Sequence, residues 1–280
     1  MNRRLLAAVF LVVSTPSWAA CQATLRSFKI YDAKGAYLGL GQVHEYKPEG
    51  EPRPGRVLVL PTTNGENTID RLYAREMCRT GYSTQGLISW PESKFDFLDP
   101  RMHNDFLKRV RYAVKALLGR SQAPVALIGT SLGGIAGSSL IAVKPRIRVA
   151  VLIATGAHIN EIISVSDHPK AVEQTEGSMK RYHLKTHEDF AEFLGRYVNQ
   201  DPSDLLPRAE HLPDTLHFLT TLDTTVPTKN QKELIALFPN PTVIQIRANH
   251  FYGIIETSAR YGKTIRNFIV SHMPEPGDDD

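Results

Sequence analysis

A serine flanked by glycines is the residue in this sequence whose type and spacing point most directly to chemistry. Gly129–Gly133 has the pattern G-x-S-x-G with Ser131 at its centre, and the short apolar run Val125–Ile128 precedes it. The stretch that follows, to about Val143, has helical character. A strand, a sharp turn and a helix in this order raise a serine hydroxyl to the top of a sheet, where it acts as a nucleophile. The alternative is a glycine-rich turn whose serine only caps the helix.

A serine hydroxyl needs a base to become nucleophilic at neutral pH, and the base needs an acid to orient it. Asp223 directly follows the apolar run Leu216–Leu222, and His250 lies just beyond the next run, Thr242–Ile246. Parallel strands end together, so both side chains are expected at the same sheet edge as the serine. We therefore predict that Ser131, Asp223 and His250 meet in space, in the chain order Ser, Asp, His.

Other residues compete for the roles of base and acid. His158, His168 and His217 are alternative bases, and Asp167 and Glu256 are alternative acids. His158 also follows a strand, but it precedes the predicted acid and so breaks the chain order. A lone histidine or aspartate is more often a surface or capping residue than a catalytic one. The order along the chain favours the assignment above.

The elements that must position these residues alternate between strands and helices. The predicted strands are Leu25–Ile30, Tyr37–Glu45, Arg56–Leu60, Leu87–Trp90, Val125–Ile128, Arg148–Ala154, Leu216–Leu222 and Thr242–Ile246. The predicted helices are Ile69–Thr80, His103–Leu118, the stretch after Ser131, His187–Val198, Lys229–Phe238 and a last helix ending near Val270. Repeated strand–helix units imply an α/β fold, a mainly parallel sheet flanked by helices.

One segment departs from this alternation. Residues 156–212 hold no convincing strand, but they include the helix at 187–198 with a capping box at Thr186 and Asp189. We expect this segment to form a small helical cap over one end of the sheet. Its apolar side chains would either enclose an acyl group or bury the cap against the sheet. Residues 20–280 are then a single domain, since α/β folds often reach about 250 residues.

The serine motif, the Asp223 turn and His250 together resemble the α/β-hydrolase family, over roughly residues 24–270. The resemblance implies the α/β-hydrolase fold. It also implies that Ser131 attacks the substrate, that His250 shuttles the proton and that Asp223 fixes the tautomer of the imidazole.

The resemblance further implies two donors for the developing oxyanion. One is the backbone amide after the nucleophile, here Leu132, and the other lies in the loop after an early buried strand. Alignment to the strand end gives Thr63 as the second donor, with Thr62 next. Family members commonly carry His-Gly where this chain has Pro61–Thr62, which leaves the identity of the second donor open.

These residues predict a serine hydrolase that cleaves an ester, thioester or amide through an acyl-enzyme, with carboxylesterase activity favoured. An acyltransferase or a peptidase would use the same three residues, and a binding protein could have kept the fold without activity. The expected partner is a small molecule or an acyl group. No cofactor is expected, because the chain has no Walker or dinucleotide motif, and its two cysteines cannot build a zinc thiolate site.

The first 19 residues have the pattern of a secretory signal peptide. A basic start, Asn2–Arg4, precedes the apolar run Leu5–Val13, and small residues lead to cleavage after Ala19. We therefore expect export to the periplasm or the medium. Cleavage leaves 31 of the 33 basic residues against 29 acidic ones, and these are scattered, which argues against a nucleic-acid partner. No apolar run is long enough for a transmembrane helix.

Export to an oxidising compartment bears on the two cysteines, Cys21 and Cys78. Paired thiols in such compartments tend to form a disulfide. An apolar face is formed by Ile69, Leu72, Tyr73 and Met77, and Cys78 points away from it, so a core thiol is not expected. The alternative is that Cys21, which lies close to the cleavage site, carries a lipid anchor.

Overall fold

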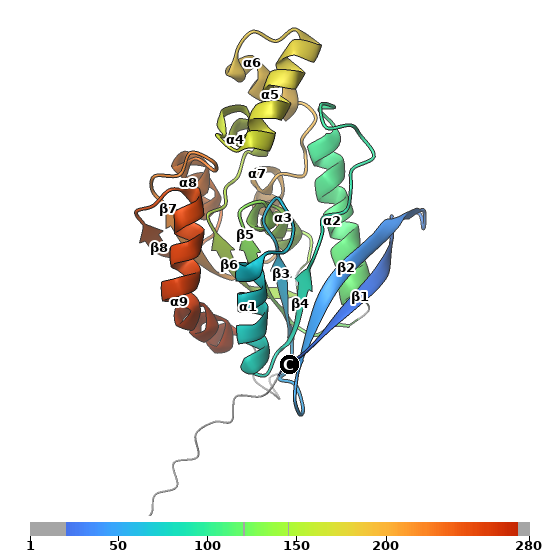
Figure 1. The fold of residues 1–280 in the computed structure, drawn as a ribbon, viewed down its shortest axis with the longest axis vertical. Coiled ribbons are helices and arrows are strands. Elements are labelled where there is room, and N and C mark those ends of the chain that lie inside the picture. The colour runs from blue at the N-terminus through green and yellow to red at the C-terminus, as the bar shows by residue number, and fades with distance from the viewer. Residues whose placement is uncertain (1–20, 120, 145, 274–280) are drawn as a thin grey trace, which may run out of the picture.

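The computed structural model describes residues 21–119, 121–144 and 146–273, so the predicted signal peptide lies outside the described residues. The described chain forms an eight-stranded sheet in the order β1-β2-β4-β3-β5-β6-β7-β8 (Figure 1). Strand β2 pairs antiparallel with β1 and β4, and the strands from β4 to β8 in this order pair in parallel. The expected mainly parallel sheet is confirmed. The strands are β1 Cys21–Tyr31, β2 Tyr37–Pro48, β3 Arg56–Leu60, β4 Ser83–Leu87, β5 Val125–Thr130, β6 Ile147–Ile153, β7 Asp214–Thr220 and β8 Thr242–Ile246.

Helices cover both faces of the sheet. Helices α2, α3 and α8 pack on one face, and α1 and α9 on the other (Figure 1). Among the described residues, no helix combines the length and the apolar character needed to cross a bilayer. The helices are α1 Thr68–Arg79, α2 Met102–Leu118, α3 Leu132–Ile141, α4 Ile159–Val165, α5 Pro169–Tyr182, α6 His187–Gly195, α7 Pro202–Leu205, α8 Thr228–Ala236 and α9 His250–His272, with a 3-10 turn at Leu206–Arg208.

The central strands are apolar on both sides because each face is covered. In β3, Leu58 and Leu60 join the core beneath α2 and α3, whereas Val57 and Val59 join the core beneath α1 and α9. Successive side chains of a strand point to opposite faces, so a strand covered on both sides reads as one continuous apolar run. That run is the reason why β3 could be predicted from the sequence at its observed bounds.

The fourth strand was predicted in the wrong place. The sequence favoured Leu87–Trp90, but β4 spans Ser83–Leu87, which reads STQGL. Three of its four buried positions, Thr84, Gln85 and Gly86, are polar or small. The Gln85 side chain donates a hydrogen bond to Glu45 at 3.0 Å, and a Cβ on Gly86 would lie 2.9 Å from a neighbouring carboxylate oxygen. Apolar patterning fails where burial is satisfied by hydrogen bonds.

The buried side of α1 matches the predicted one only in part, since Tyr73 and Met77 are buried as expected. Leu72, expected in the core, is 52% exposed, and Cys78, expected to point away, is fully buried. The helix packs on the sheet beside α9, where Arg266 contacts Glu76 at 3.1 Å, so the covered face is set by two neighbours. The buried residues of α1 are Asp70, Tyr73, Ala74, Met77 and Cys78.

A disulfide joins Cys21 to Cys78, with the Cα atoms 6.1 Å apart. It ties the first residue of β1 to the end of α1. A sulfur bonded to another sulfur leaves no thiol for a lipid, so the structure favours the disulfide over the lipid anchor considered for Cys21.

The segment between β6 and β7 contains helices and no strand. Helices α4, α5 and α6 lie beyond one end of the sheet, above the start of α3 (Figure 1). Three isoleucines of α4 and two residues of α6 pack on Ile135 of α3 and on Val226. This apolar cluster holds the helices over the carboxyl ends of the parallel strands.

Replacing Cys21 with serine should lower the free energy of unfolding by about 4 kcal/mol. The disulfide spans a sequence separation of 57 residues, and its loss returns that loop's entropy to the unfolded chain. Urea unfolding with and without a reductant measures the effect. The unmodified protein and the variant should unfold alike in reductant. A variant as stable as the oxidised protein would contradict a stabilising disulfide.

Asp70 should make the fold less stable as pH rises. Burial raises the pKa of its carboxyl to about 7, against about 4 in an unfolded chain. The folded state therefore holds the proton more tightly, and the free energy of unfolding falls between about pH 4 and pH 7. Asp70→Asn should remove this fall. The melting temperature of the variant minus that of the unmodified protein should therefore be at least about 2 °C higher at pH 8 than at pH 4.5.

The exposed Asp214 provides the control for that comparison, because Asp214→Asn should shift the melting temperature equally at both pH values. Melting measured by circular dichroism is sufficient. If the difference between Asp70→Asn and the unmodified protein is the same at pH 4.5 and pH 8, the carboxyl of Asp70 does not take up a proton on folding.

Candidate active site

Ser131 lies in the tight turn between β5 and α3. Its backbone has φ 55° and ψ −120°, a region that residues other than glycine rarely adopt. Its amide donates to the carbonyl of Ile153 at 2.9 Å, and its own carbonyl accepts from the Gly134 amide at 2.9 Å. These hydrogen bonds hold the strained turn in place and fix the hydroxyl at the carboxyl end of the sheet.

Small residues around the serine are required by close backbone contacts. A Cβ on Gly129 would lie 2.6 Å from the carbonyl oxygen of Gly133, and a Cβ on Gly133 would lie 2.3 Å from that of Leu60. At Gly134 the nearest atom would be in Thr155, at 2.5 Å. Backbone oxygens cannot move aside as a flexible side chain can. The glycines therefore serve the turn and its contact with the end of β3.

The structure brings the three predicted residues together. His250 Nε2 lies 2.9 Å from Ser131 Oγ, and His250 Nδ1 lies 2.7 Å from Asp223 Oδ2. The aspartate side chain is fully buried, and 15% of the histidine side chain is exposed. A carboxylate only accepts, so Nδ1 carries the proton and Nε2 is free to accept the serine proton.

Asp223 is held by more donors than the histidine alone. Its Oδ2 also accepts from Thr220 Oγ1 at 2.7 Å and from Gln231 Nε2 at 2.9 Å. Its Oδ1 accepts from the amides of Thr225 at 3.0 Å and Val226 at 2.9 Å. A buried charge is stable only when its lone pairs are satisfied in this way. The bonds also fix the carboxylate plane toward the imidazole.

The competing histidines lie elsewhere or lack an acid. His217 is buried in β7 beside Phe238, and burial lowers its pKa to about 3. His158 lies 3.9 Å from Glu233. His168 does face the same site as Ser131, but its Nδ1 accepts from the Lys170 amide at 3.3 Å.

The competing acids are hydrogen-bonded to groups other than the imidazole. Asp167 accepts hydrogen bonds from the hydroxyls of Thr224 and Thr225, both at 2.5 Å. These bonds lower the pKa of its carboxyl. Glu256 contacts Arg260 on the outside of α9 at 2.7 Å. The geometry therefore favours Asp223 as the partner of the histidine.

Two backbone amides point to the space beside the serine. Leu132 is the first residue of α3, where an N–H has no partner within the helix. Among the described residues, neither its amide nor that of Thr63 donates to another protein group. The carbonyl of Thr62 instead accepts from Trp90 Nε1 at 2.8 Å and from the Gly65 amide at 3.0 Å. Thr63 lines the same cavity as Ser131 and Leu132, whereas Thr62 does not, so Thr63 is better placed to donate.

Two hollows meet at Ser131. One is a cavity of about 280 Å³ between the sheet and α4 and α5, lined mainly by apolar side chains, and Thr63 and Leu132 lie in its wall. The other is a groove of about 720 Å³ that runs past His250 toward α9. Phe251, on the rim of the groove, is 66% exposed. A substrate held at the serine would place one arm in each hollow.

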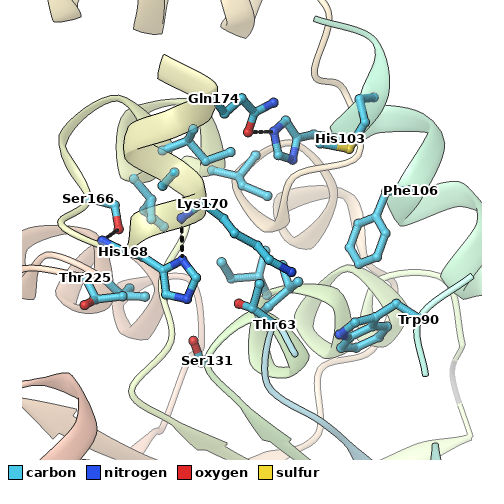
Figure 2. Close-up of a pocket in the computed structure, with 18 of the residues that line it drawn as sticks. Thr63, Trp90, His103, Phe106, Ser131, Ser166, His168, Lys170, Gln174 and Thr225 are labelled. Carbon is cyan, nitrogen blue, oxygen red and sulfur yellow. Dashed lines mark hydrogen bonds between the residues drawn. The ribbon is translucent and has the colours of Figure 1, made fainter. Parts of the chain in front are cut away.

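The isoleucines of α4 both bury the cap and line the cavity. Ile159, Ile162 and Ile163 belong to the apolar cluster beneath the cap and also to the cavity wall. Phe190 belongs to the cluster alone. In Figure 2 the cavity lies between helix α5 above, Ser131 below and Trp90 to one side. The two uses that the sequence left open for these side chains therefore coexist.

Some residues of the site carried no sequence signal. Thr220, Gln231 and Trp90 are ordinary residues whose roles come from contacts across the fold. The Asn249 side chain caps α9 by accepting from the Tyr252 amide at 3.0 Å, and a cap just before a helix is a pattern that could have been read. No group of three His, Cys, Asp or Glu side chains in the described ranges is placed to bind a metal ion.

Solved structures share this arrangement of elements at low sequence identity. An esterase from Pyrococcus furiosus is 13% identical with a TM-score of 0.58, over 90% of this chain and 94% of its own. An acetyl xylan esterase from Paenibacillus sp. R4 is 16% identical with a TM-score of 0.61, over 88% of this chain and 89% of its own. The chain has the α/β-hydrolase fold.

A puromycin-hydrolysing peptidase from Mycobacterium tuberculosis is also similar, at 12% identity and a TM-score of 0.62, over 91% of this chain and 40% of its own. No protein-family model matches the sequence, and no curated protein does. The likeness thus lies in the α/β-hydrolase fold.

Gly133→Ala should lower the free energy of unfolding by about 1–3 kcal/mol or more, because about 1–3 kcal/mol is the usual cost of overpacking. The added Cβ would meet the carbonyl oxygens of Leu60 and Pro61 at 2.3 and 2.5 Å. Gly262→Ala is the matched control, since nothing lies within 4 Å of its added Cβ, and it should stabilise α9 by up to about 1 kcal/mol. Thermal unfolding compares the two. Equal stability of both variants would mean that the turn is loosely packed.

Proposed function

We propose that this chain is a serine hydrolase that cleaves a carboxylic ester through an acyl-enzyme on Ser131. One observation carries the proposal: an unbroken set of hydrogen bonds from Asp223 through His250 to the serine hydroxyl, at 2.7 and 2.9 Å. The set lies where an apolar cavity and an open groove meet. Two of the similar solved structures are named as esterases, which favours an ester over an amide.

The reaction begins with proton transfer from Ser131 Oγ to His250 Nε2 as the oxygen attacks the carbonyl carbon. Asp223 stabilises the imidazolium that forms. The five hydrogen bonds on its carboxylate keep it oriented toward the imidazole. The imidazolium then gives its proton to the departing alcohol, and the acyl group stays on the serine. Water, activated by the same imidazole, releases the acid.

The amides of Leu132 and Thr63 are proposed as the donors for the developing oxyanion. They lie in the wall of the cavity beside the serine, and Leu132 is also at the N-terminus of α3, whose dipole favours negative charge. The contact between Gly133 and the end of β3 holds the two donors in one unit. Thr62 would support the loop through its carbonyl.

The two hollows would divide the substrate. The apolar cavity suits the acyl group, and the groove past His250 suits the alcohol, which can leave toward solvent. The cap over residues 156–212 would close the acyl side and exclude water from it. A small-molecule ester with an apolar acyl group is the substrate class that fits.

We also propose that the protein works outside the cytoplasm. The pattern of residues 1–19 is that of an export signal. The disulfide between Cys21 and Cys78 supports this proposal, since such bonds persist in oxidising compartments. The periplasm and the medium are both compatible with it.

Ser131→Ala should abolish turnover of p-nitrophenyl butyrate and labelling by a fluorophosphonate. The change removes the attacking oxygen, and removal of such a nucleophile typically costs about 10⁶ in kcat. Peptide mapping of the labelled protein should place the adduct on Ser131. The labelling rate should also fall in acid, because a protonated His250 cannot accept the serine proton.

Ser258→Ala is the matched control, because this serine lies on α9 and its hydroxyl donates to the carbonyl of Ile255. It should keep full labelling and turnover. Both variants should melt within a few degrees of the unmodified protein. A Ser131→Ala variant that still hydrolyses the ester, or an adduct on another residue, would refute the proposed mechanism.

A further inference from the structure

A histidine that takes no part in the proton transfer lies in the wall of the acyl cavity. His103 belongs to the first turn of α2, only 8% of it is exposed, and it lines the 280 Å³ cavity. In Figure 2 it lies above the cavity, with Ser131 at the opposite end. Its ring would therefore meet the part of an acyl group that lies farthest from the ester carbonyl.

The protonation of this ring is fixed by its neighbours. Gln174 Nε2 donates to the backbone carbonyl of Phe97 at 2.9 Å, which places the amide NH₂ on that side. Gln174 Oε1 then faces His103 Nε2 at 2.9 Å and can only accept. The proton of the neutral ring must therefore lie on Nε2, and Nδ1 keeps a lone pair.

That lone pair has no partner in the protein. Among residues 21–119, 121–144 and 146–273, no group donates a hydrogen bond to His103 Nδ1. Figure 2 shows this second ring nitrogen turned toward the cavity. Burial lowers the pKa of His103 to about 4, so the ring stays a neutral acceptor at neutral pH.

The rest of the wall around this acceptor is mostly apolar. Trp90 and Phe106 meet edge to face at 5.4 Å on one side, and the isoleucines of α4 lie on another. Among the described residues that line the cavity, Lys170 carries the one formal charge, and its side chain is exposed. An acyl group that fills the cavity leaves Nδ1 unpaired unless it brings a donor of its own.

We infer that His103 selects an acyl group that is apolar along its length and carries a hydrogen-bond donor, such as a hydroxyl, at its far end. The inference rests on the proposed function, because it assumes that the acyl group lies in this cavity. A buried acceptor left unpaired costs enough to reduce kcat/KM by about fivefold to a hundredfold. A donor of the right reach removes that cost.

The test uses p-nitrophenyl esters that differ only at the far end of the acyl group. One series is 3-phenylpropanoate with hydrogen, hydroxyl, methyl, methoxy or carboxylate at the para position. The other is octanoate with hydrogen, hydroxyl or methoxy at carbon 8. Neither hydroxyl can cyclise readily onto its own ester. A methoxy group accepts but does not donate, so it matches the hydroxyl in polarity and lacks only the proton.

For at least one hydroxylated ester, the kcat/KM of the unmodified protein should be about tenfold or more above that for every other uncharged ester of the same series. In His103→Leu that preference should shrink to within about twofold of unity, whatever the change in kcat/KM for the unsubstituted ester. His211→Leu replaces an exposed histidine outside the cavity and should keep the preference. Gln174→Met, which frees the tautomer, should weaken it.

Each outcome separates this inference from the proposed function. Hydrolysis of the plain esters without preference for a hydroxyl in either series overturns the inference and leaves the hydrolase intact. A preference that survives in His103→Leu also overturns it. A preference for the carboxylate over the hydroxyl assigns the recognition to Lys170 instead. If no ester is hydrolysed and the fluorophosphonate does not label Ser131, the proposed function fails and this inference fails with it.

Discussion

The close approach of two backbone segments beneath Ser131 is the constraint on which the rest of the site depends. Gly133 lies so near the carbonyl oxygens of Leu60 and Pro61 that no side chain fits between them. The contact joins the serine turn to the loop that carries Thr63, so the nucleophile and the two free amides move as one unit. A site that must stabilise charge within a fraction of an ångström gains more from this rigidity than from any single hydrogen bond.

The same end of the sheet holds a buried negative charge. Asp223 is completely enclosed, and five donors satisfy its carboxylate. Two of these donors, Thr220 and Gln231, also hydrogen-bond each other, so the group behaves as a connected network. Such a network is costly if one member is missing, and it leaves His250 a single orientation toward the serine.

The helices between β6 and β7 form one wall of the cavity at this edge of the sheet. Without them the serine would lie on an open edge. With them, an apolar cavity forms on one side of Ser131, and the acceptor on His103 is set by a hydrogen-bond chain that crosses from α5 to α2. His103 and Gln174 are 71 residues apart, so the tautomer of His103 is set by a contact between α2 and the cap.

The sequence by itself determined the order of the strands along the chain, the serine turn and the residues expected to meet there. Buried parallel strands read as apolar runs, and the glycines at positions 129 and 133 mark the turn that carries Ser131. It misplaced β4 and the buried face of α1, because those positions are covered by neighbours that patterning does not see, and polar residues there are satisfied by distant partners. Only the tertiary structure decided which donors hold Asp223, which loop amide faces the serine and that His103 presents an acceptor to the cavity. Each of these depends on contacts between residues far apart in the chain, whose geometry no local pattern encodes.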